Sequence, residues 1–543
     1  MLSYRKLAMR VLGHPLHTGG IDSPRPASQR AAAFILTAAM LTTLAAPAFA
    51  DIWHIENGDI TISAGESGNN VTQNNNTTYG DTNTVITNQN KDTASSHTVT
   101  IETNDKNDKV EVTLKDVNID ASSRSEAAVS VTGEGNTNIE LDGDNALKSD
   151  IYSSGISSSG SLTISGGENN SLTAQGGSGS GIFSSGGVTI SGGTVNATGG
   201  TGGTGENSNG GSGIYIYSSS GSLTVSGGTV TANGGSGGGN GGDGISSTNT
   251  TISGGSTVTA NGGNGGSLVG GDGIRSGGGL TVSDGTVTAK GGNGDSKDGY
   301  GGDGIRSGGV VTISGNTVNA AGGYGGKVGG YGICSFDRVA ISGGTVEAAG
   351  GNGSTGGGSG IYSSVIDLSG SLELTAKAGS PNGKALSQNG SELVLDTIKD
   401  KLGPGAKVTA TDADGKVIDQ VSTPRPVEPE ESSSSSDGGS SAPSAPASPL
   451  PGLTVTDKDG QRISYTSTQS GNTLTVCVGR LTASFRISLA ALRQLRAEGI
   501  ETIAFQTVLC STTLSVDELL AMGGEDAEAV LTHQLTDSSL TVG

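Results

Sequence analysis

A short motif that returns eight times constrains the fold of this chain more than any other feature. Its anchor is a Gly-Ile pair, and consecutive anchors lie 26 to 32 residues apart. Each anchor is followed by an LTI-like triplet, a Ser-Gly-Gly-like corner, a TVTA-like stretch and a glycine-rich run, as in GDGIRSGGVVTISGNTVNAAGG. Repeats of this length are stacked units that bury a core only together. The anchors are Gly155-Ile156, Gly181-Ile182, Gly213-Ile214, Gly244-Ile245, Gly273-Ile274, Gly304-Ile305, Gly332-Ile333 and Gly360-Ile361.

Each repeat contains three short segments in which apolar and polar residues alternate, which is the period of a half-buried β-strand. The first segment is the anchor itself, the second resembles Leu162-Thr163-Ile164, and the third resembles Thr194-Val195-Asn196-Ala197. Glycine-rich corners separate them, and glycine adopts the positive φ that tight corners need. The pattern predicts an all-β fold, a three-sided parallel β-helix with short corners, wound right-handed as parallel crossovers are. The alternative, a disordered glycine-rich spacer, does not explain why the alternation keeps its register.

Composition divides the chain further. Basic residues, then an uncharged stretch that ends in Ala48-Phe49-Ala50, indicate a secretory signal peptide, with a membrane anchor as the alternative. A proline- and serine-rich linker separates the repeats from a C-terminal segment that has the strand and helix-capping patterns of a small α+β domain. The expected domains are a signal peptide over 1–50, the β-helix over 51–422 (cap and degenerate rungs 51–150, regular rungs 151–380, closing rungs 381–422), the linker over 423–451 and the small domain over 452–543.

Charge, histidines and cysteines exclude several classes of function. The net charge of −21 argues against nucleic-acid partners and anionic membranes, and no segment after the signal peptide is apolar enough to span a bilayer. None of the five histidines lies in the repeats, so a Ser-His-acid site or a zinc site is not expected there. A Cys477–Cys510 disulfide and two independent thiols both stay open.

The residue before each Gly-Ile anchor forms a candidate metal site. On three consecutive repeats it is Asp243, Asp272 and Asp303, which stacking places about 5 Å apart. Calcium would relieve the repulsion of stacked carboxylates. The alternative is an exposed ladder in which Arg275 and Arg306, three residues after Asp272 and Asp303, neutralise the aspartates.

Aromatic residues on the outer face form a candidate carbohydrate site. Phe183, Tyr215 and Tyr362 each follow an anchor isoleucine, and Tyr217 lies nearby. Flat rings suit the apolar face of a sugar, although strand propensity alone would also place rings there. Outward threonine and asparagine rows would add hydrogen-bonding groups; they contain Thr231, Thr259, Thr288, Asn196 and Asn319.

With these repeats, residues 51–422 resemble secreted clostridial β-helix proteins that are usually labelled carbohydrate-binding domain-containing proteins. The segments that carry the resemblance are WHIENGDITISA at 53–64, KVEVTLKDVNIDAS at 109–122, AAVSVTGEGNTNIELDGDNALKS at 127–149 and the LTISGGTVTANGG rungs. The resemblance implies a right-handed β-helix, binding to plant or acidic polysaccharides, and often bound calcium. It assigns no ligand to a numbered residue here.

Together these observations predict a secreted or cell-surface, adhesin-like rod that binds polysaccharide without cleaving it, with cell-wall association as a further expectation. The candidate carbohydrate-binding residues are Phe183, Tyr215, Tyr217, Tyr362, Arg275 and Arg306, and the candidate calcium ligands are Asp243, Asp272 and Asp303. A polysaccharide lyase or glycosidase is one alternative, supported by fold analogy alone, and short corners leave little from which to build groove walls. A structural stalk or protein-binding adhesin is the other.

Overall fold

The computed structural model describes residues 51–424 except 151 and 220, and residues 452–542 except 458–461, 464, 471, 479–481, 508–510, 523–526 and 534–537. The predicted signal peptide and nearly all of the predicted linker lie outside these residues. The described residues form two compact units, one within residues 1–429 and one within residues 430–543, which we describe separately. The structure is 51% strand and 6% helix, and its largest part is a β-solenoid of about 14 turns.

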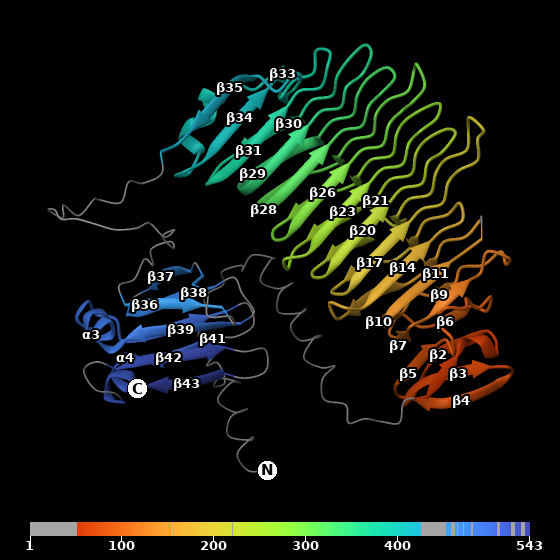
Figure 1. Ribbon diagram of the computed structural model, residues 1–543, viewed down its shortest axis with the longest axis horizontal. Helices are drawn as coiled ribbons and strands as arrows, with labels where there is room; N and C mark the ends of the chain where they lie inside the picture. Colours follow the sequence, from red (N-terminus) through yellow and green to blue (C-terminus); the bar gives the residue numbers. More distant parts are fainter. Residues whose placement is uncertain are drawn as a thin grey trace, which may run out of the picture. The chain divides into compact units, whose positions relative to one another are not determined.

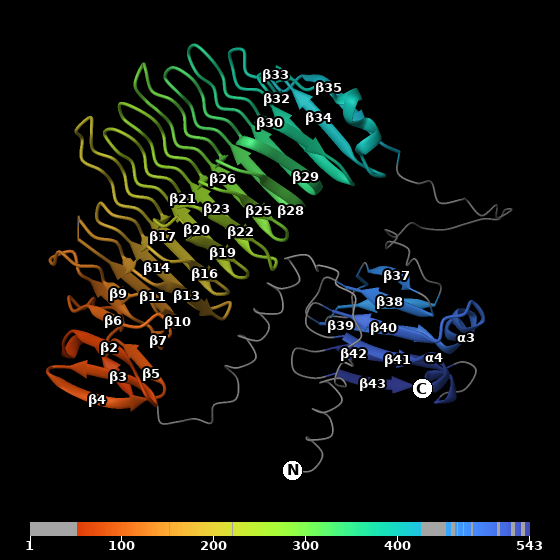
Figure 2. The same ribbon diagram turned by 180° about the vertical axis from the view of Figure 1, so that it is seen from behind.

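Each turn of the solenoid contributes strands to three parallel ladders, as the three alternating segments predict (Figures 1 and 2). The first ladder contains β2 (Ile60–Gly65), β6 (Val99–Thr103), β9 (Val129–Gly133), β12 (Ile156–Ser158), β15 (Ile182–Ser184), β18 (Ile214–Ile216), β21 (Ile245–Ser247), β24 (Ile274–Ser276), β27 (Ile305–Ser307) and β32 (Leu386–Gln388). The second contains β1 (Ile52–His54), β5 (Thr84–Thr87), β7 (Lys109–Lys115), β10 (Asn136–Asp142), β13 (Ser161–Gly166), β16 (Val188–Ile190), β19 (Ser222–Val225), β22 (Asn249–Ile252) and β25 (Leu280–Val282). The third contains β8 (Asn118–Asp120), β11 (Asp144–Lys148), β14 (Ser171–Gln175), β17 (Thr194–Thr198), β20 (Thr229–Asn233), β23 (Thr257–Asn261), β26 (Thr286–Lys290), β31 (Leu372–Lys377) and β34 (Lys407–Thr411).

Three long strands join two or three ladders where the corner between segments stays extended: β28 (Val311–Ala321), β29 (Ile333–Ala349) and β30 (Ile361–Leu368). Register is kept from rung to rung, so that Val230 of β20 pairs with Val258 of β23 and Val258 pairs with Val287 of β26. The prediction of a parallel β-helix of stacked repeats is confirmed. Right-handed winding stays a prediction.

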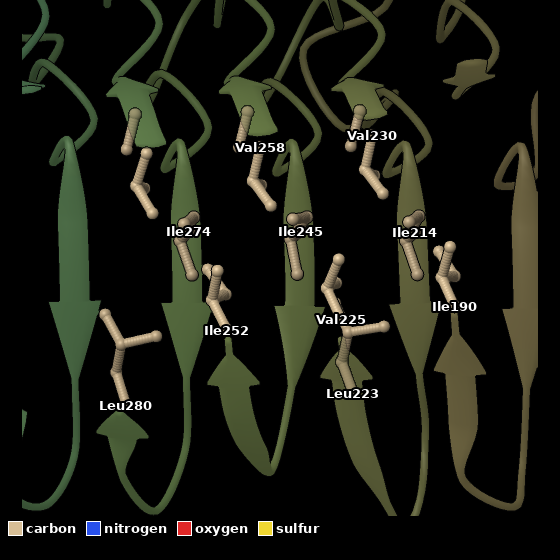
Figure 3. Packing of buried hydrophobic residues seen from close by; sticks show 14 of the residues in the cluster. Ile190, Ile214, Leu223, Val225, Val230, Ile245, Ile252, Val258, Ile274 and Leu280 are labelled. Carbon is tan, nitrogen blue, oxygen red and sulfur yellow. The ribbon is translucent and has the colours of Figure 1, made fainter. Parts of the chain in front are cut away.

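The core is the column of inward side chains from the three ladders. All eight anchor isoleucines are fully buried. Figure 3 shows Ile214, Ile245 and Ile274 in a row, one from each successive rung, with Val225 and Ile252 of the second ladder packed beside them. Each such side chain contributes about 1.5–3 kcal/mol when it is fully removed from water. The alternation therefore specifies the coil, because only this register buries every apolar position.

The polar rows on the third ladder lie where the sequence places them. Asn196, Thr231, Thr259, Thr288 and Asn319 occupy equivalent register positions on successive rungs and are half-buried. They form one outward row along the coil.

The expectation of short corners is wrong between the third strand of one rung and the first strand of the next. Long glycine-rich loops project there and run side by side along one edge of the coil (Figure 1). The loops form what we call the glycine wall; they are residues 199–213, 234–244, 262–273, 291–304, 322–332 and 350–360. Isolated bridges connect equivalent positions of neighbouring loops, such as Gly265 with Gly294 and Val269 with Tyr300.

A chain of backbone hydrogen bonds holds the glycine wall together. The N–H of Gly323 donates to the carbonyl of Gly302 (2.8 Å), Gly302 donates to Gly292 (2.9 Å), and Gly292 donates to Gly271 (2.8 Å). None of these glycines has a positive φ. A methyl group on Gly292 would lie 2.0 Å from the carbonyl oxygen of Gly263. Glycine is required at positions such as Gly292 because the neighbouring backbone approaches too closely there for a side chain.

Positive φ is used at a different corner, the one between the second and third segments of a rung. Gly193, Gly228 and Gly344 have φ of 75°, 76° and 81° there. The same position is taken by Asn316, with φ of 77°, and asparagine tolerates this conformation better than most residues. The predicted role of glycine in tight corners is therefore confirmed here.

The two ends of the coil are covered by antiparallel strands. At the start, β3 (Gly68–Gln73) pairs with β2 and with β4 (Asn76–Asp81), and a 3-10 helix, η1 (Ile55–Asn57), follows β1. At the end, β35 (Val417–Ser422) pairs with β34, β33 (Ser391–Glu392) pairs with β32, and η2 (Leu395–Lys401) is a 3-10 helix. Within the predicted closing rungs, Leu393–Leu395 is not a strand, because Val394 is exposed and Leu395 already begins η2. Leu395 and Ile398 of η2 are buried at this end of the coil.

In its described residues, the second unit contains two four-stranded sheets and two helices. The strands are β36 (Leu453–Thr456), β37 (Thr466–Ser470), β38 (Thr473–Cys477), β39 (Ala483–Ser488), β40 (Thr502–Gln506), β41 (Ser511–Ser515), β42 (Glu528–His533) and β43 (Ser538–Val542). Phe485 and Phe505 pack with ring centroids 5.0 Å apart. Ser488 caps α3 (Leu489–Ala497) and Ser515 caps α4 (Val516–Ala521), as their positions in the sequence predict.

The cysteines of this unit leave the predicted alternatives open. Cys477 forms no disulfide with another described cysteine, and its Sγ lies 3.5 Å from Oε1 of Gln506. Cys510 lies outside the described residues. Among the described helices, none is long and apolar enough to cross a membrane.

Candidate functional site

The candidate site lies where the glycine wall meets the first ladder. Two columns of side chains run along the coil there, one just before and one just after the buried isoleucines. In the second column, strand register stacks Phe183 on Tyr215 and Arg275 on Arg306. Ser246 lies between Tyr215 and Arg275, and Cys334 lies between Arg306 and Tyr362. Five of the predicted site residues therefore lie in this one column.

The first column contains the predicted aspartates, which form a ladder of hydrogen bonds. The Oδ1 of Asp243 accepts from the backbone N–H of Asp272 (2.8 Å), and the Oδ1 of Asp272 accepts from the N–H of Asp303 (2.7 Å). The Oδ1 of Asp303 continues the series by accepting from the N–H of Tyr331 (2.7 Å). Each carboxylate thus fixes the corner of the next rung. We call Asp243, Asp272 and Asp303 the aspartate ladder.

The second oxygen of each aspartate faces an arginine. Nε of Arg275 lies 2.9 Å from Oδ2 of Asp272 and 3.3 Å from Oδ2 of Asp243. Nη1 of Arg306 lies 3.0 Å from Oδ2 of Asp303. The side chains of Asp272 and Asp303 are only 4% and 5% exposed, whereas those of Arg275 and Arg306 are 49% and 37% exposed. The expected neutralising ladder is present, but Asp272 and Asp303 are buried and Asp243 is half-buried rather than exposed.

Burial shifts the ionisation of the outer two aspartates. Burial, together with the charge of Asp272, raises the pKa of Asp243 to about 6 and that of Asp303 to about 7, although Arg275 and Arg306 act in the opposite direction. Burial also raises the pKa of the Cys334 thiol to about 12. The ladder therefore gains protons at mildly acidic pH while its arginines keep their charge.

Three hollows lie along this face, and together we call them the binding strip. The aspartate hollow, about 560 Å³, contains the aspartate ladder, both arginines, Tyr331 and the Val269, Tyr300 and Val328 arms of the glycine wall. The tyrosine hollow, about 540 Å³, is lined by Tyr215, Tyr217, Ser246, Ser247, Thr248 and Arg275. The hydroxyl hollow, about 640 Å³, is lined by Thr98, Thr100, Glu126, Ser130, Thr132, Tyr152, Ser157 and Phe183.

One shared side chain and one contact between rings connect the three hollows. Arg275 lines both the aspartate hollow and the tyrosine hollow. Phe183 of the hydroxyl hollow contacts Tyr215 of the tyrosine hollow, with ring centroids 5.8 Å apart, and Tyr215 contacts Tyr217 at 6.0 Å. The hollows therefore form one continuous strip rather than three isolated sites.

The structure brings three of the four predicted aromatic residues together and separates the fourth. Phe183, Tyr215 and Tyr217 form one cluster. Tyr362 lies beyond the arginines, where its ring stacks on Tyr331 at 4.8 Å. Rings therefore flank the charged centre on both sides.

Several residues of the strip were missed by sequence reasoning. Tyr331 occupies the position before an anchor, so the repeat alignment could have identified it. Phe336 of β29 lies beside the strip rather than in one of its hollows, and its ring lies 4.9 Å from Cζ of Arg306. Tyr300 carries no signal in sequence, because it lies in a glycine loop whose path the repeat does not specify; Lys327 Nζ lies 5.5 Å from its ring.

The contacts of the aspartate ladder bear on the calcium prediction. In the described residues, no group of three or more histidine, cysteine or acidic side chains has the arrangement of a metal site. Oδ1 of each aspartate already accepts a backbone N–H, and Oδ2 faces a guanidinium. A calcium ion would have to displace an arginine to gain carboxylate oxygens. Calcium binding stays a prediction, and these contacts favour arginine as the partner of the ladder.

No protein-family model, curated protein or solved structure matches this chain.

Proposed function

We propose that this protein is a secreted or cell-surface binding rod that holds an extended polysaccharide along the binding strip and does not cleave it. The observation that carries the proposal is the continuity of the three hollows along one face of the coil. From β6 to β29 the strip crosses nine rungs, which at strand spacing is roughly 40 Å. A long, shallow and open strip fits an extended polymer better than a compact ligand.

The chemistry of the strip agrees with a sugar ligand. Phe183, Tyr215 and Tyr217 present rings that are amphipathic or apolar and suit the C–H face of a sugar ring. Serine and threonine hydroxyls line the hydroxyl hollow and the tyrosine hollow, and each can donate and accept hydrogen bonds. Side chains on a β-helix are held by the ladder beneath them, so the strip is organised before ligand binds.

The carboxylates of the aspartate hollow support binding rather than hydrolysis. A glycosidase places two carboxyl groups on opposite sides of the scissile bond. Here Asp243, Asp272 and Asp303 stand in a single column, each held by a backbone N–H and an arginine. A lyase or glycosidase is the second candidate, and the appearance of new reducing ends or unsaturated sugars in a bound polymer would establish it.

We expect Tyr215→Ala to weaken binding about tenfold, which corresponds to about 1.4 kcal/mol. Tyr215 is central to the strip, since its ring contacts both Phe183 and Tyr217. A polysaccharide and glycan array first identifies the best ligand of the full chain. Titration with that ligand then measures the loss of affinity. The matched control is Tyr79→Ala, because Tyr79 is exposed on β4 and lines none of the three hollows.

If Tyr215→Ala and Tyr79→Ala bind like the unaltered protein, the strip is not the binding face. If no glycan binds at all, the remaining candidate is a structural stalk or an adhesin for a protein ligand, and its binding would be independent of sugar.

A further inference from the structure

Both arginines of the aspartate hollow have N–H groups that do not donate to the aspartate ladder. Arg275 contacts the ladder through Nε, and Arg306 contacts it through Nη1. A guanidinium has five N–H donors in a planar fork, and no hydrogen bond from the other nitrogens is found among the described residues. Both side chains are about half exposed, so these donors face the hollow and the solvent beyond it.

The two guanidinium groups lie on adjacent rungs. Arg275 of β24 pairs in register with Arg306 of β27, so the side chains start about 5 Å apart. Arginine pairs in this arrangement suit planar oxyanions, since each fork can donate two parallel hydrogen bonds to a carboxylate. The buried aspartates fix the guanidinium positions from below, which lowers the cost of ordering them on binding.

We propose that Arg275 and Arg306 form a subsite for a carboxylate of the bound glycan, so that the ligand of the strip is an acidic polysaccharide contacted directly by arginine. This inference rests on the proposed function. The rings on either side of the pair, Tyr215 with Tyr217 and Tyr331 with Tyr362, would hold the sugar units that flank the acidic unit.

Competition inside the hollow makes the subsite sensitive to pH. The aspartate ladder and a ligand carboxylate compete for the same two cations. As pH falls towards 6, Asp243 and Asp303 take up protons because their pKa values are raised, whereas a sugar carboxylic acid stays ionised down to about pH 4. Affinity for an acidic glycan therefore rises as pH falls from 8 to 5.5. The chain's overall negative charge opposes binding at long range, but physiological salt screens it beyond about 8 Å.

The other groups around the arginine pair do not reverse this direction. They are Asp272, Cys334, Tyr215, Tyr217, Tyr300, Tyr331, Tyr362 and Lys327. Burial raises the pKa values of the Tyr215 and Tyr331 hydroxyls and of the Cys334 thiol, so these groups stay neutral below pH 8.

The test compares each acidic polymer with its own carboxyl-reduced form. Polygalacturonate, alginate and hyaluronan are titrated against the full chain at pH 8 and pH 5.5, in chelator and at fixed salt. We expect at least one acidic polymer to bind at least tenfold more tightly than its reduced form. We expect that ratio to grow at least threefold at pH 5.5. Calcium-bridged binding would instead need calcium and weaken in acid.

Two variants locate the subsite. Arg275→Lys with Arg306→Lys keeps the charge on the ladder and loses the planar fork, so the acidic preference should fall severalfold while the fold is retained. Arg338→Gln, at an exposed arginine that lines none of the hollows, is the matched control and should change nothing.

The outcomes separate the two proposals. If acidic and reduced polymers bind equally and Tyr215→Ala weakens both, the strip binds glycans and the carboxylate subsite is wrong. If the acidic preference survives both lysine substitutions, or falls at pH 5.5, the arginine pair is not its source. If no polymer binds in either form, both proposals are overturned.

Discussion

Replacing Gly323 with alanine is expected to destabilise the solenoid by on the order of 3 kcal/mol. The added methyl carbon would lie 2.0 Å from the carbonyl oxygen of Gly292 and 2.6 Å from its carbon. That carbonyl belongs to backbone in the neighbouring loop of the wall and cannot rotate away as a side chain would. Relief requires the two loops to separate, which breaks the hydrogen bond from Gly323 to Gly302 and the bonds that follow it.

The matched control for this prediction is Gly356→Ala. Gly356 lies in the same wall, also has no positive φ, and its nearest neighbours would be the Val328 methyl groups at 3.7 Å. Alanine there should be neutral or slightly stabilising, because it reduces the entropy of the unfolded chain. Thermal or denaturant unfolding compares the two variants, and hydrogen exchange shows whether the loss is confined to nearby rungs, as expected for a repeat protein. Equal stability of the two variants would show that the wall tolerates a side chain.

The glycine wall also shows where sequence reasoning stops. The rungs were predictable because alternating side chains record which face is buried, and Ile214, Ile245 and Ile274 occupy the core positions that their spacing requires. A run of glycines has no such alternation, so it does not indicate which positions are buried. Gly193 is required for its positive φ, and Gly323 is required because two backbones approach closely there. The sequence shows only a glycine at each position and does not distinguish the two requirements. The glycine-rich runs therefore predict short corners, whereas the structure shows loops that form one side of the aspartate hollow.

The sequence predicts where the candidate site lies, but not the hydrogen bonds and the burial of its aspartates. The spacing of the repeats is sufficient to predict that Asp272 lies next to Asp303, and Arg275 next to Arg306, on adjacent rungs. Nothing in the spacing indicated that each carboxylate would accept the backbone N–H of the next rung, because that bond depends on the path of the loop before the anchor. The aspartate side chains are shielded from solvent because the glycine wall covers the aspartate ladder on one side. The misplaced expectation of exposed aspartates and the missed Tyr300 thus have the same cause.

The pH dependence of stability is the second large effect that we expect. Asp243 and Asp303 have folded-state pKa values of about 6 and about 7, against 3.8 for an ordinary aspartate. Between pH 4 and pH 7 the folded protein therefore holds protons that the unfolded chain releases, so the stability that these groups contribute decreases as pH rises. This contribution is complete below about pH 4 and is lost as pH passes through 6 and 7. The loss is between roughly 3 and 7 kcal/mol, with the upper value applying if the two groups titrate independently.

The double variant Asp243→Asn with Asp303→Asn isolates this contribution from that of the many other acidic residues. Asparagine keeps an oxygen that can accept the backbone N–H of the next rung, but it cannot gain or lose a proton. The free energy of unfolding, measured by denaturant titration from pH 4 to pH 8, should fall more steeply with rising pH for the unaltered protein than for the variant. Parallel curves would mean that the ladder is ionised throughout this range. In that case the arginine pair would remain fully engaged by aspartate at pH 5.5, and acid could not free it for a ligand carboxylate. The stability curve and the binding curve therefore depend on the same two protons, and they should change over the same range of pH.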